Sequence, residues 1–396
     1  MRGFALNSIS RVLVIVFQLA NVKLYTNYLG AEHLGIYFFL LAVSYSANAL
    51  LFVPVDYYQQ ANLAKVIAVS GGARSLLEFN GRLAGLYLFL SLCIVLICVA
   101  IKPDYAVYAS LVVVLAFALY VVQALRNTLN NLEYRNCVSV SFIQEAVVKV
   151  FAFLVLVKFF EADEVLLIDA WLIALAVSGS YLFYMTYRHR IFHPASVEKI
   201  NAKDVFIFSY PFSIGAVCNW LQLQGYRLVL VPLGFAAEVG VFATLSSIGS
   251  AAIGAVSLIY TQQFTPLLYK TAGQYTTKYL KGAVAVLVSV AIVSFVVGEF
   301  VVSLLTRPEF VPHWELLLFG VLADGANLFI GALAIHVTLK DDTRKLIYSS
   351  VLGLVLMAVC LGILYWTTTI SISTIGVPLL FSQWVVVACM CLMYKK

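Results

Sequence analysis

Three basic residues lie inside long apolar stretches of this sequence, where a charge needs a partner or a hydrated cavity. They are Arg11, Lys149 and Arg227. A cation in hydrocarbon is costly, so it usually faces a cavity, a counter-ion or a ligand. Arginine and lysine side chains also offset the desolvation of an anion such as phosphate. All three are therefore candidates to bind an anion, although the Arg11 side chain could instead extend to lipid headgroups.

Neutral polar side chains share helix faces with two of these cations. On a helix over 6–26, five polar residues fall within an arc of about 80°, namely Asn7, Arg11, Gln18, Asn21 and Tyr25. In a later segment, one face carries Asn219, Gln222 and Tyr226, with Arg227 at its margin. Superposing the two segments puts Gln18 opposite Gln222. We expect these side chains to line a substrate cavity. The alternative is that the amides bond to neighbouring helices.

Two acidic residues in apolar stretches are candidates for ion coupling or charge pairing. Glu145 precedes Lys149 by four residues, a spacing that brings two side chains together on one helix face. Asp324 lies deep in an apolar stretch, with Asn327 one turn later. A carboxylate there could bind a coupling proton or sodium ion, or it could be a protonated acid bonded to a neighbour. We expect no other cofactor.

The sequence contains no pattern of a catalytic or metal site. A glycine-rich phosphate loop, a GxSxG turn and an HExxH pair are all absent. The seven cysteines show no CxxC or CxxH spacing, and most lie in apolar runs, where cysteine behaves as a small hydrophobe. We therefore predict that the protein is not an enzyme, has no catalytic residues and binds no metal.

These candidate residues belong to a chain that is too apolar to be water-soluble. Of its 396 residues, 63% are hydrophobic and 11% are charged, whereas a soluble domain carries roughly 25% charged residues. Soluble enzymes and nucleic-acid-binding proteins are thereby excluded. A helix of about 20 apolar residues crosses a bilayer, and the apolar stretches predict an all-α integral membrane protein with twelve transmembrane helices. The uncharged stretch 346–394 must turn, and the polar run 366–371 is the natural place.

The positions of the charges orient the predicted spans. If both termini are cytoplasmic, most of the 25 Lys and Arg residues fall in cytoplasmic segments, Arg126 and Arg135 among them. This is the asymmetry that the positive-inside rule predicts. The net charge of +6 thus reflects topology, and no nucleic-acid partner is expected.

A polar segment divides the spans into two sets of six. We predict an N-terminal six-helix bundle over 1–190, a cytoplasmic linker over 191–204 and a C-terminal six-helix bundle over 205–396. Both halves contain Leu-Gly, a short spacer and then Gly-aliphatic-aromatic, in 29–37 and 233–242. The glycines predict a tight turn and close packing of the following helix. Two halves with an even number of spans form a parallel repeat, as in transporters that rock two bundles around a central site.

The run from Tyr25 to Tyr37 resembles the start of Wzx-type flippases of O-antigen and polysaccharide repeat units. These belong to the multidrug/oligosaccharidyl-lipid/polysaccharide (MOP) exporter superfamily. Their pattern is approximately aliphatic-Thr-Arg-x-Leu-Gly, four residues and then Gly-aliphatic-Tyr, and Asn27 stands where Arg is usual. Tyr226 stands where the family commonly has Asp, whereas Arg227 matches. Segment 263–270 is similar to the family segment that ends the eighth span.

This resemblance implies a MATE-like pair of bundles in a bacterial inner membrane. It implies alternating access that moves an undecaprenyl-diphosphate-linked oligosaccharide from the cytoplasmic to the periplasmic leaflet. The expected partners are this lipid-linked sugar, membrane lipid, and the polymerase and chain-length regulator of the same O-antigen or lipopolysaccharide pathway. Two alternatives stay open. One is an ion-coupled multidrug or small-molecule antiporter of the same superfamily, with Asp324 as coupling acid. The other is a polysaccharide polymerase or ligase, which the short outside loops disfavour.

Overall fold

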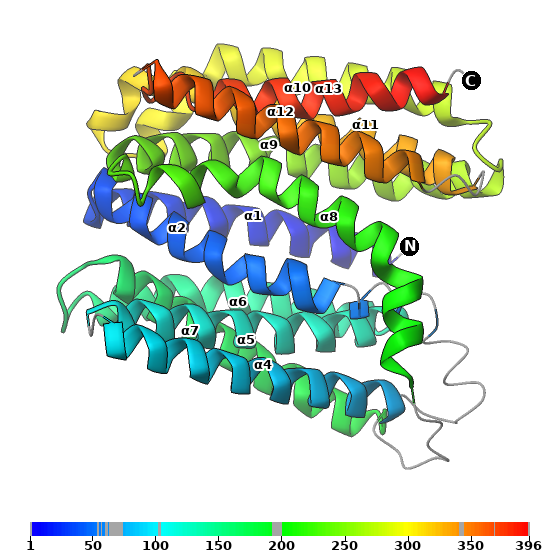
Figure 1. The fold of residues 1–396 in the computed structure, drawn as a ribbon, viewed down its shortest axis with the longest axis horizontal. Coiled ribbons are helices and arrows are strands. Elements are labelled where there is room, and N and C mark those ends of the chain that lie inside the picture. Colours follow the sequence, from blue (N-terminus) through cyan, green and yellow to red (C-terminus); the bar gives the residue numbers. More distant parts are fainter. Residues whose placement is uncertain are drawn as a thin grey trace. The chain divides into compact units, whose positions relative to one another are not determined.

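The regular elements of the structure are all helices (Figure 1). It is a computed structural model that describes residues 2–53, 55–56, 58–59, 62, 74–101, 104–191, 200–339, 344–367 and 369–394. The helices in these ranges are α1 (Arg2–Tyr28), α2 (Ala31–Ala47), η1 (Asn48–Phe52), α4 (Arg74–Ile101), α5 (Asp104–Asn131), α6 (Arg135–Leu156), α7 (Glu164–Arg188), α8 (Ala202–Leu230), α9 (Ala236–Lys270), α10 (Thr276–Leu305), η2 (Pro308–Leu316), α11 (Leu317–Leu339), α12 (Arg344–Trp366) and α13 (Gly376–Tyr394). The predicted all-α class is confirmed.

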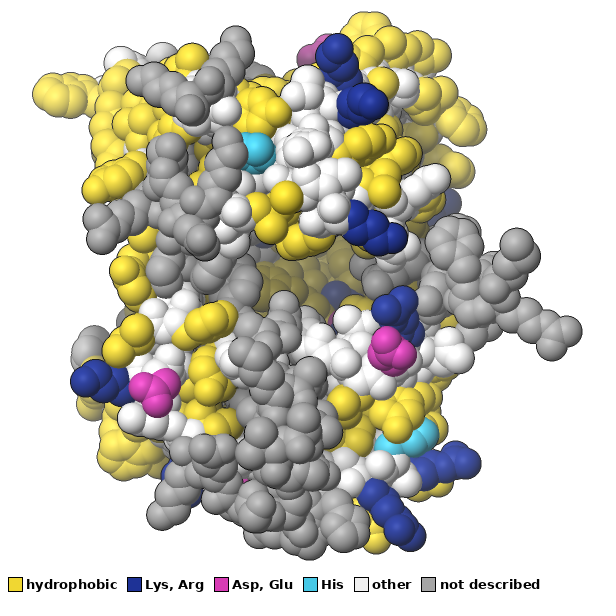
Figure 2. All heavy atoms as spheres, turned by 90° about the vertical axis from the view of Figure 1, so that its right-hand side faces the viewer, with side chains coloured by type: hydrophobic (Ala, Val, Ile, Leu, Met, Phe, Trp, Pro, Cys, Tyr) yellow, Lys and Arg dark blue, Asp and Glu magenta, His cyan; other side chains and the backbone are white. Residues whose placement is uncertain are grey.

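Ten helices in the described ranges are long and apolar enough to cross a membrane. α1 and α8 are not among the ten, but with 27 and 29 residues they exceed the length of about 20 residues that a span needs. The predicted turn at 366–371 is confirmed, since α12 ends at Trp366 and α13 begins at Gly376. Figure 2 shows the face at the right-hand side of Figure 1, where Lys and Arg side chains and a few acidic ones lie among hydrophobic side chains. The cytoplasmic location of both termini stays a prediction.

The chain divides into two compact units. Unit 1 contains residues 1–21 and 40–213, and unit 2 contains residues 22–39 and 214–396. The end of α1 and the start of α2, with the first Leu-Gly turn between them, therefore belong to unit 2. The predicted bundles and linker stay a prediction, and residues 192–199 of that linker lie outside the described residues.

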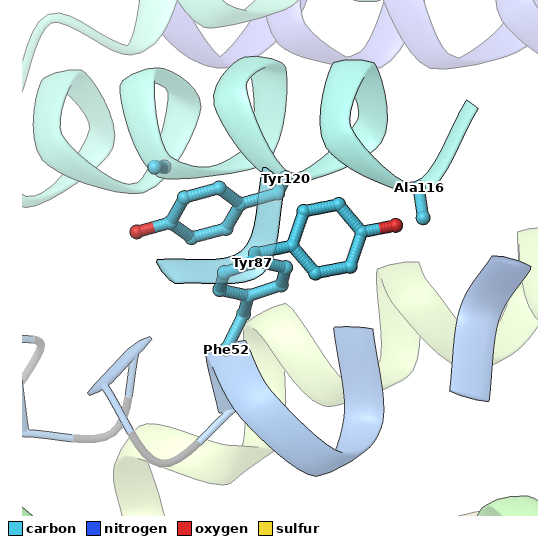
Figure 3. Packing of buried hydrophobic residues seen from close by; sticks show 5 residues of the cluster. Phe52, Tyr87, Ala116 and Tyr120 are labelled. Carbon is cyan, nitrogen blue, oxygen red and sulfur yellow. The ribbon is translucent and has the colours of Figure 1, made fainter. Parts of the chain in front are cut away.

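Aromatic rings fill the interior of unit 1 between η1, α4 and α5. Phe52 stacks on Tyr120 with ring centroids 3.6 Å apart, and Tyr87 meets Phe52 edge-on at 5.4 Å (Figure 3). The Tyr120 hydroxyl donates to Asn80 Oδ1 at 2.7 Å, and the Asn80 amide donates to Gln59 at 3.2 Å. The polar end of the ring cluster is thus hydrogen-bonded inside the unit, as buried polar groups require.

Two glycines let α2 and α9 approach each other backbone to backbone in unit 2. A Cβ atom on Gly35 of α2 would overlap the carbonyl oxygen of Ala236, the first residue of α9. A Cβ atom on Gly240 of α9 would overlap the carbonyl oxygen of Ala31, the first residue of α2. The contacts are reciprocal because each helix begins with Ala and has Gly four residues later. Small residues bring helices together in this way in membranes, as the repeated sequence pattern predicts.

α9 and α11 make a second contact of the same kind. A Cβ atom on Gly249 would overlap the carbonyl oxygen of Leu317, and a Cβ atom on Gly320 would overlap that of Ser246. This contact holds the serine-rich face of α9 directly against α11.

Replacing Gly35 by alanine tests the contact between α2 and α9. The added methyl group would overlap the Ala236 carbonyl oxygen, so the helices must separate. We expect the free energy of unfolding to fall by about 1–3 kcal/mol, the usual cost of overpacking. Gly30→Ala is the matched control, because a Cβ atom at Gly30 meets no atom within 4 Å. Thermal unfolding of the detergent-purified chain measures both variants, and equal melting temperatures would contradict the contact.

Candidate functional site

A chain of hydrogen-bonded amides joins helices of unit 2 to Asp324. Asn327 of α11 donates to Asp324 Oδ1 at 3.4 Å and accepts from Asn219 of α8 at 3.5 Å. Gln383 of α13 donates to the side-chain oxygens of Asn219 at 3.1 Å and of Gln222 at 3.3 Å. Gln222 in turn donates to a backbone carbonyl of α12 at 2.9 Å. Amide-to-amide bonds satisfy polar groups that hydrocarbon would leave unpaired.

Asp324 also lines a cavity of about 200 Å³ between α8, α9, α11 and α13, here called the Arg227 cavity. Its polar lining residues are Gln224, Tyr226, Arg227, Ser246, Ser247, Ser250 and Asp324. One basic and one acidic side chain therefore share a single cavity with hydroxyl and amide groups. The remaining lining residues are apolar or glycine.

Aromatic groups hold Arg227 in the wall of this cavity. Its Nε donates to the Tyr226 hydroxyl at 2.9 Å, and its guanidinium carbon lies 4.8 Å from the Phe38 ring centroid. A guanidinium over a ring face is stabilised by the ring quadrupole. Among the described residues that line this cavity, Arg227 is the only basic and Asp324 the only acidic one. The charge of the cavity is therefore set by Arg227 and Asp324.

A second cavity, of about 330 Å³, extends from Asp324 toward the C-terminal end of α11, and we call it the Thr261 cavity. Its polar lining residues are Ser257, Thr261, Thr265, Tyr279, Asp324 and Asn327. Of the described residues that line these two cavities, Asp324 alone lines both. Asp324 thus borders both cavities.

Unit 1 contains a different charged cluster. Arg126 Nη2 of α5 pairs with Glu145 Oε2 of α6 at 2.7 Å, and Trp171 Nε1 of α7 donates to Glu145 Oε1 at 2.8 Å. Lys149 Nζ lies 4.0 Å from the centroid of the Trp171 ring. Arg126 is buried within α5 and also donates to the Ser141 hydroxyl at 2.9 Å, and its expected location on the cytoplasmic side stays a prediction. Glu145 therefore forms an ion pair with Arg126, and a role in ion coupling stays a prediction.

The other predicted cavity residues lie in α1. Gln18 is exposed, whereas Asn21 is buried and donates to its own helix backbone at 2.9 Å. The side chain of Arg11 lies outside the described residues. Unit 2, in contrast, brings together the predicted residues of α8 and α11 through the amide chain and the Arg227 cavity, namely Asn219, Gln222, Arg227 and Asp324.

Several members of these clusters were missed by sequence reasoning, Gln383 and Arg126 among them. Gln383 is the only amide in the stretch 346–394, and this isolation in an uncharged region was a usable signal. Arg126 follows directly on the apolar run 105–125, so the predicted end of that span excluded it by one residue. To predict that Arg126 lies inside the helix, one would have had to know its partner on α6, Glu145.

The Arg227 cavity can bind groups of either sign. Arg227 can donate charge-assisted hydrogen bonds to phosphate oxygens. Asp324 can take up a proton or a small cation, since carboxylate oxygens are ligands for hard cations. In the part of the chain that is described, no group of three or more His, Cys, Asp or Glu could hold a metal ion.

No protein-family model matches the chain, and no curated protein matches it. Among solved structures it is similar to a multidrug resistance MATE family transporter of the MOP superfamily in the inward-facing conformation. That match has a TM-score of 0.67 and 14% identity, and covers 98% of this chain and 97% of the other. The chain has the MATE transporter fold. The outward-facing conformation of such a transporter matches with a TM-score of 0.68 and 13% identity, over 99% of this chain and 94% of that chain.

A MOP superfamily transporter from Pyrococcus furiosus has the same fold. It matches with a TM-score of 0.61 and 14% identity, over 99% of this chain and 94% of that chain. The binding pocket of that protein is described as having reversed polarity, which suggests a different function for it. These likenesses span the whole chain, so the predicted MATE-like architecture is confirmed and the protein is a multi-pass membrane protein.

Removing Arg126 tests whether its ion pair stabilises unit 1. Arg126→Met leaves the Glu145 carboxylate without its 2.7 Å partner, and we expect the free energy of unfolding to fall by about 3–5 kcal/mol. The double variant Arg126→Met/Glu145→Gln removes both charges and should recover most of that loss. Unfolding of the purified proteins measures the effect, with exposed Arg135→Met as control. A double variant no more stable than Arg126→Met would contradict the ion-pair account.

Proposed function

We propose that this protein is a Wzx-type flippase. It translocates undecaprenyl-diphosphate-linked oligosaccharide repeat units from the cytoplasmic to the periplasmic leaflet of a bacterial inner membrane. The observation that carries the proposal is the position of Arg227, a basic side chain that lines a polar cavity within a MATE-fold unit.

The chemistry of the substrate explains why such a residue is needed. A lipid diphosphate is anionic, and moving its head group across hydrocarbon requires compensation of the charge. Arg227 supplies that compensation, because a guanidinium binds phosphate oxygens in a bidentate manner. The serine hydroxyls and the Gln224 amide beside it are suited to sugar hydroxyls. At about 200 Å³ the cavity is below the usual size of a ligand pocket, so it fits the diphosphate rather than a whole oligosaccharide.

Alternating access is the mechanism that the fold supports. The chain resembles both the inward-facing and the outward-facing conformations of MATE transporters. In the proposed cycle the head group enters from one side of the membrane and leaves on the other, while the lipid chain stays in hydrocarbon. Asp324 couples the cycle to a proton or a sodium ion. Lys149, Gln18, Asn21 and Arg11 remain candidate contacts for the sugar or phosphate groups.

The proposed substrate also defines the partners. The flippase would act with membrane lipid, with the polymerase that joins repeat units and with the chain-length regulator of the same O-antigen or lipopolysaccharide pathway. These partners follow from the chemistry of a lipid-linked repeat unit that must be polymerised after it has crossed.

The second candidate is an ion-coupled multidrug or small-molecule antiporter. Two observations favour it, the acid Asp324 in the cavity and the multidrug transporters among the similar folds. A positive Arg227 in the same cavity disfavours cationic drugs. One fold can host pockets of different polarity, as the description of the P. furiosus protein illustrates.

The decisive substitution is Arg227→Ala in a strain that depends on this protein for its surface polysaccharide. We expect the surface polymer to fall at least about tenfold, because a lost hydrogen bond to a charged group costs roughly 1.5–3 kcal/mol. Lipid-linked repeat units should accumulate on the cytoplasmic face. Arg82→Ala is the matched control at equal expression, since Arg82 is exposed on α4. Gel analysis of the polymer and extraction of the lipid-linked intermediate give the readouts.

Two outcomes would decide against the flippase. A strain that lacks the protein and still makes normal surface polymer contradicts it directly. Resistance to cationic drugs that requires the protein and is lost in Asp324→Asn would instead support the antiporter.

A further inference from the structure

Two apolar cavities lie along α8 and α12 in unit 2. Their volumes are about 310 Å³ and 740 Å³, and Gly362 and Tyr365 of α12 line both. We propose that together they form one site, here called the acyl groove, which binds an acyl chain of a membrane phospholipid from the leaflet nearest the α12–α13 turn. The site is independent of the transported substrate.

The lining of the acyl groove matches the chemistry of a hydrocarbon chain. Every described residue that lines either cavity is apolar, aromatic or glycine, and the polar side-chain groups among them are those of Tyr365 and Trp366. A charged or sugar ligand would lose its hydrogen bonds there. The α8 residues of the groove lie on the helix face opposite to Arg227, namely Leu221, Gly225, Leu228 and Val229.

The groove extends over the depth of one leaflet. On α12 its lining reaches from Leu354 to Tyr365, a helix length of about 17 Å at 1.5 Å per residue. One leaflet is half of a hydrocarbon core that is about 30 Å thick. The acyl chain of a bilayer lipid fills this depth, whereas an undecaprenyl chain is far longer. The length of the groove therefore favours a phospholipid.

The end of α12 places the mouth of the groove at the membrane surface. Trp366 is 87% exposed and Tyr365 is 50% exposed, and such rings are enriched at the level of the lipid headgroups. The turn over 369–374 is rich in hydroxyl groups, and the Thr374 hydroxyl accepts from the backbone N–H of Ser371 at 2.8 Å. A lipid whose chain enters the groove here keeps its polar head beside this turn.

Gly362 leaves the hollow that a chain can fill. A glycine inside a helix is destabilising relative to alanine, and at Gly249 the close approach of α11 explains it. A Cβ atom at Gly362, in contrast, meets no atom within 4 Å. Met357 and Leu361 of the same lining are buried and form the floor. Attraction in hydrocarbon comes from van der Waals contact, and a chain in this hollow touches protein on more than one side.

The experiment maps where a photoactivatable phospholipid reacts with the full chain. Phosphatidylethanolamine with a diazirine at the end of one acyl chain is mixed into lipid nanodiscs, and mass spectrometry of peptides locates the adducts. We expect adducts near Leu221 and Leu354, at the deep end of the groove. They should exceed those around exposed Ile292 of α10 at least about fivefold, because the groove adds van der Waals contacts. Equal labelling of the two regions would overturn the proposal.

Gly362→Leu fills the groove. Because a Cβ atom there meets no neighbour, we expect the variant to fold and its labelling near Leu354 to fall to the level of α10. Ala358→Phe, from the same lining, is a second way to fill it. Gly85→Leu on α4, which also enters open space, is the control and should be labelled as the parent is. Labelling that survives unchanged in both groove variants would overturn the proposal.

Thermal unfolding gives a second readout. Without lipid, Gly362→Leu should melt no lower than the parent. Added phosphatidylethanolamine should raise the melting temperature of the delipidated parent more than that of Gly362→Leu, because a ligand that binds the folded state stabilises it. An equal rise in both proteins would count against a bound chain.

Competition identifies the source of the chain. Excess unlabelled phosphatidylethanolamine should remove the labelling near Leu354, whereas undecaprenyl phosphate at the same concentration should leave it. If undecaprenyl phosphate removes it instead, the groove holds a prenyl chain and the phospholipid assignment falls. The flippase test with Arg227→Ala is separate, because Arg227 lies on the other face of α8.

Discussion

Backbone contact between α9 and α11 is the constraint on which the Asp324 site depends. Gly249 and Gly320 have no Cβ atom, so each helix touches a backbone carbonyl of the other. At that spacing Ser246 and Ser250 face the same cavity as Asp324. A Cβ atom at either glycine would overlap the backbone of the facing helix, so the two helices would have to separate beside this cavity. The reciprocal contact between α2 and α9 lies nearer the start of the same helix, so the N-terminal half of α9 contacts the backbones of both α2 and α11.

The charged side chains inside the two units differ in their surroundings. In unit 1, Arg126 and Trp171 both donate to Glu145, so this carboxylate has its partners inside the protein. In unit 2, Arg227 and Asp324 line a cavity instead. A closed pair holds helices together, whereas charges that line a cavity can exchange partners with a ligand. An ionisable residue inside a membrane therefore indicates function only when its surroundings leave room for a ligand.

The parts of the fold that depend on local pattern could be predicted from the sequence. Apolar run length predicts the helices, and the polar run at 366–371 predicts the last turn. The Ala31–Gly35 pattern and its repeat predict close packing without naming the partner. Gln383 and the Arg126–Glu145 pair escaped prediction because their meaning lies in contacts between distant helices. That residues 22–39 belong to unit 2 could not be predicted either, because it also depends on contacts between helices far apart in the sequence.

The placement of segment 22–39 also governs how the chain can be assembled. The Thr26 hydroxyl donates to the carbonyl of Leu305, 279 residues later, at 3.2 Å. At synthesis rates of about 5–20 residues per second, on the order of 15–55 s pass between the synthesis of Thr26, in the hairpin of α1 and α2, and that of Leu305. The backbone contact between α2 and α9 can form only after residue 240 has entered the bilayer. During biogenesis the glycine face of the first hairpin is therefore exposed to lipid, insertion machinery or a chaperone, and unit 2 closes last although it contains some of the earliest residues made.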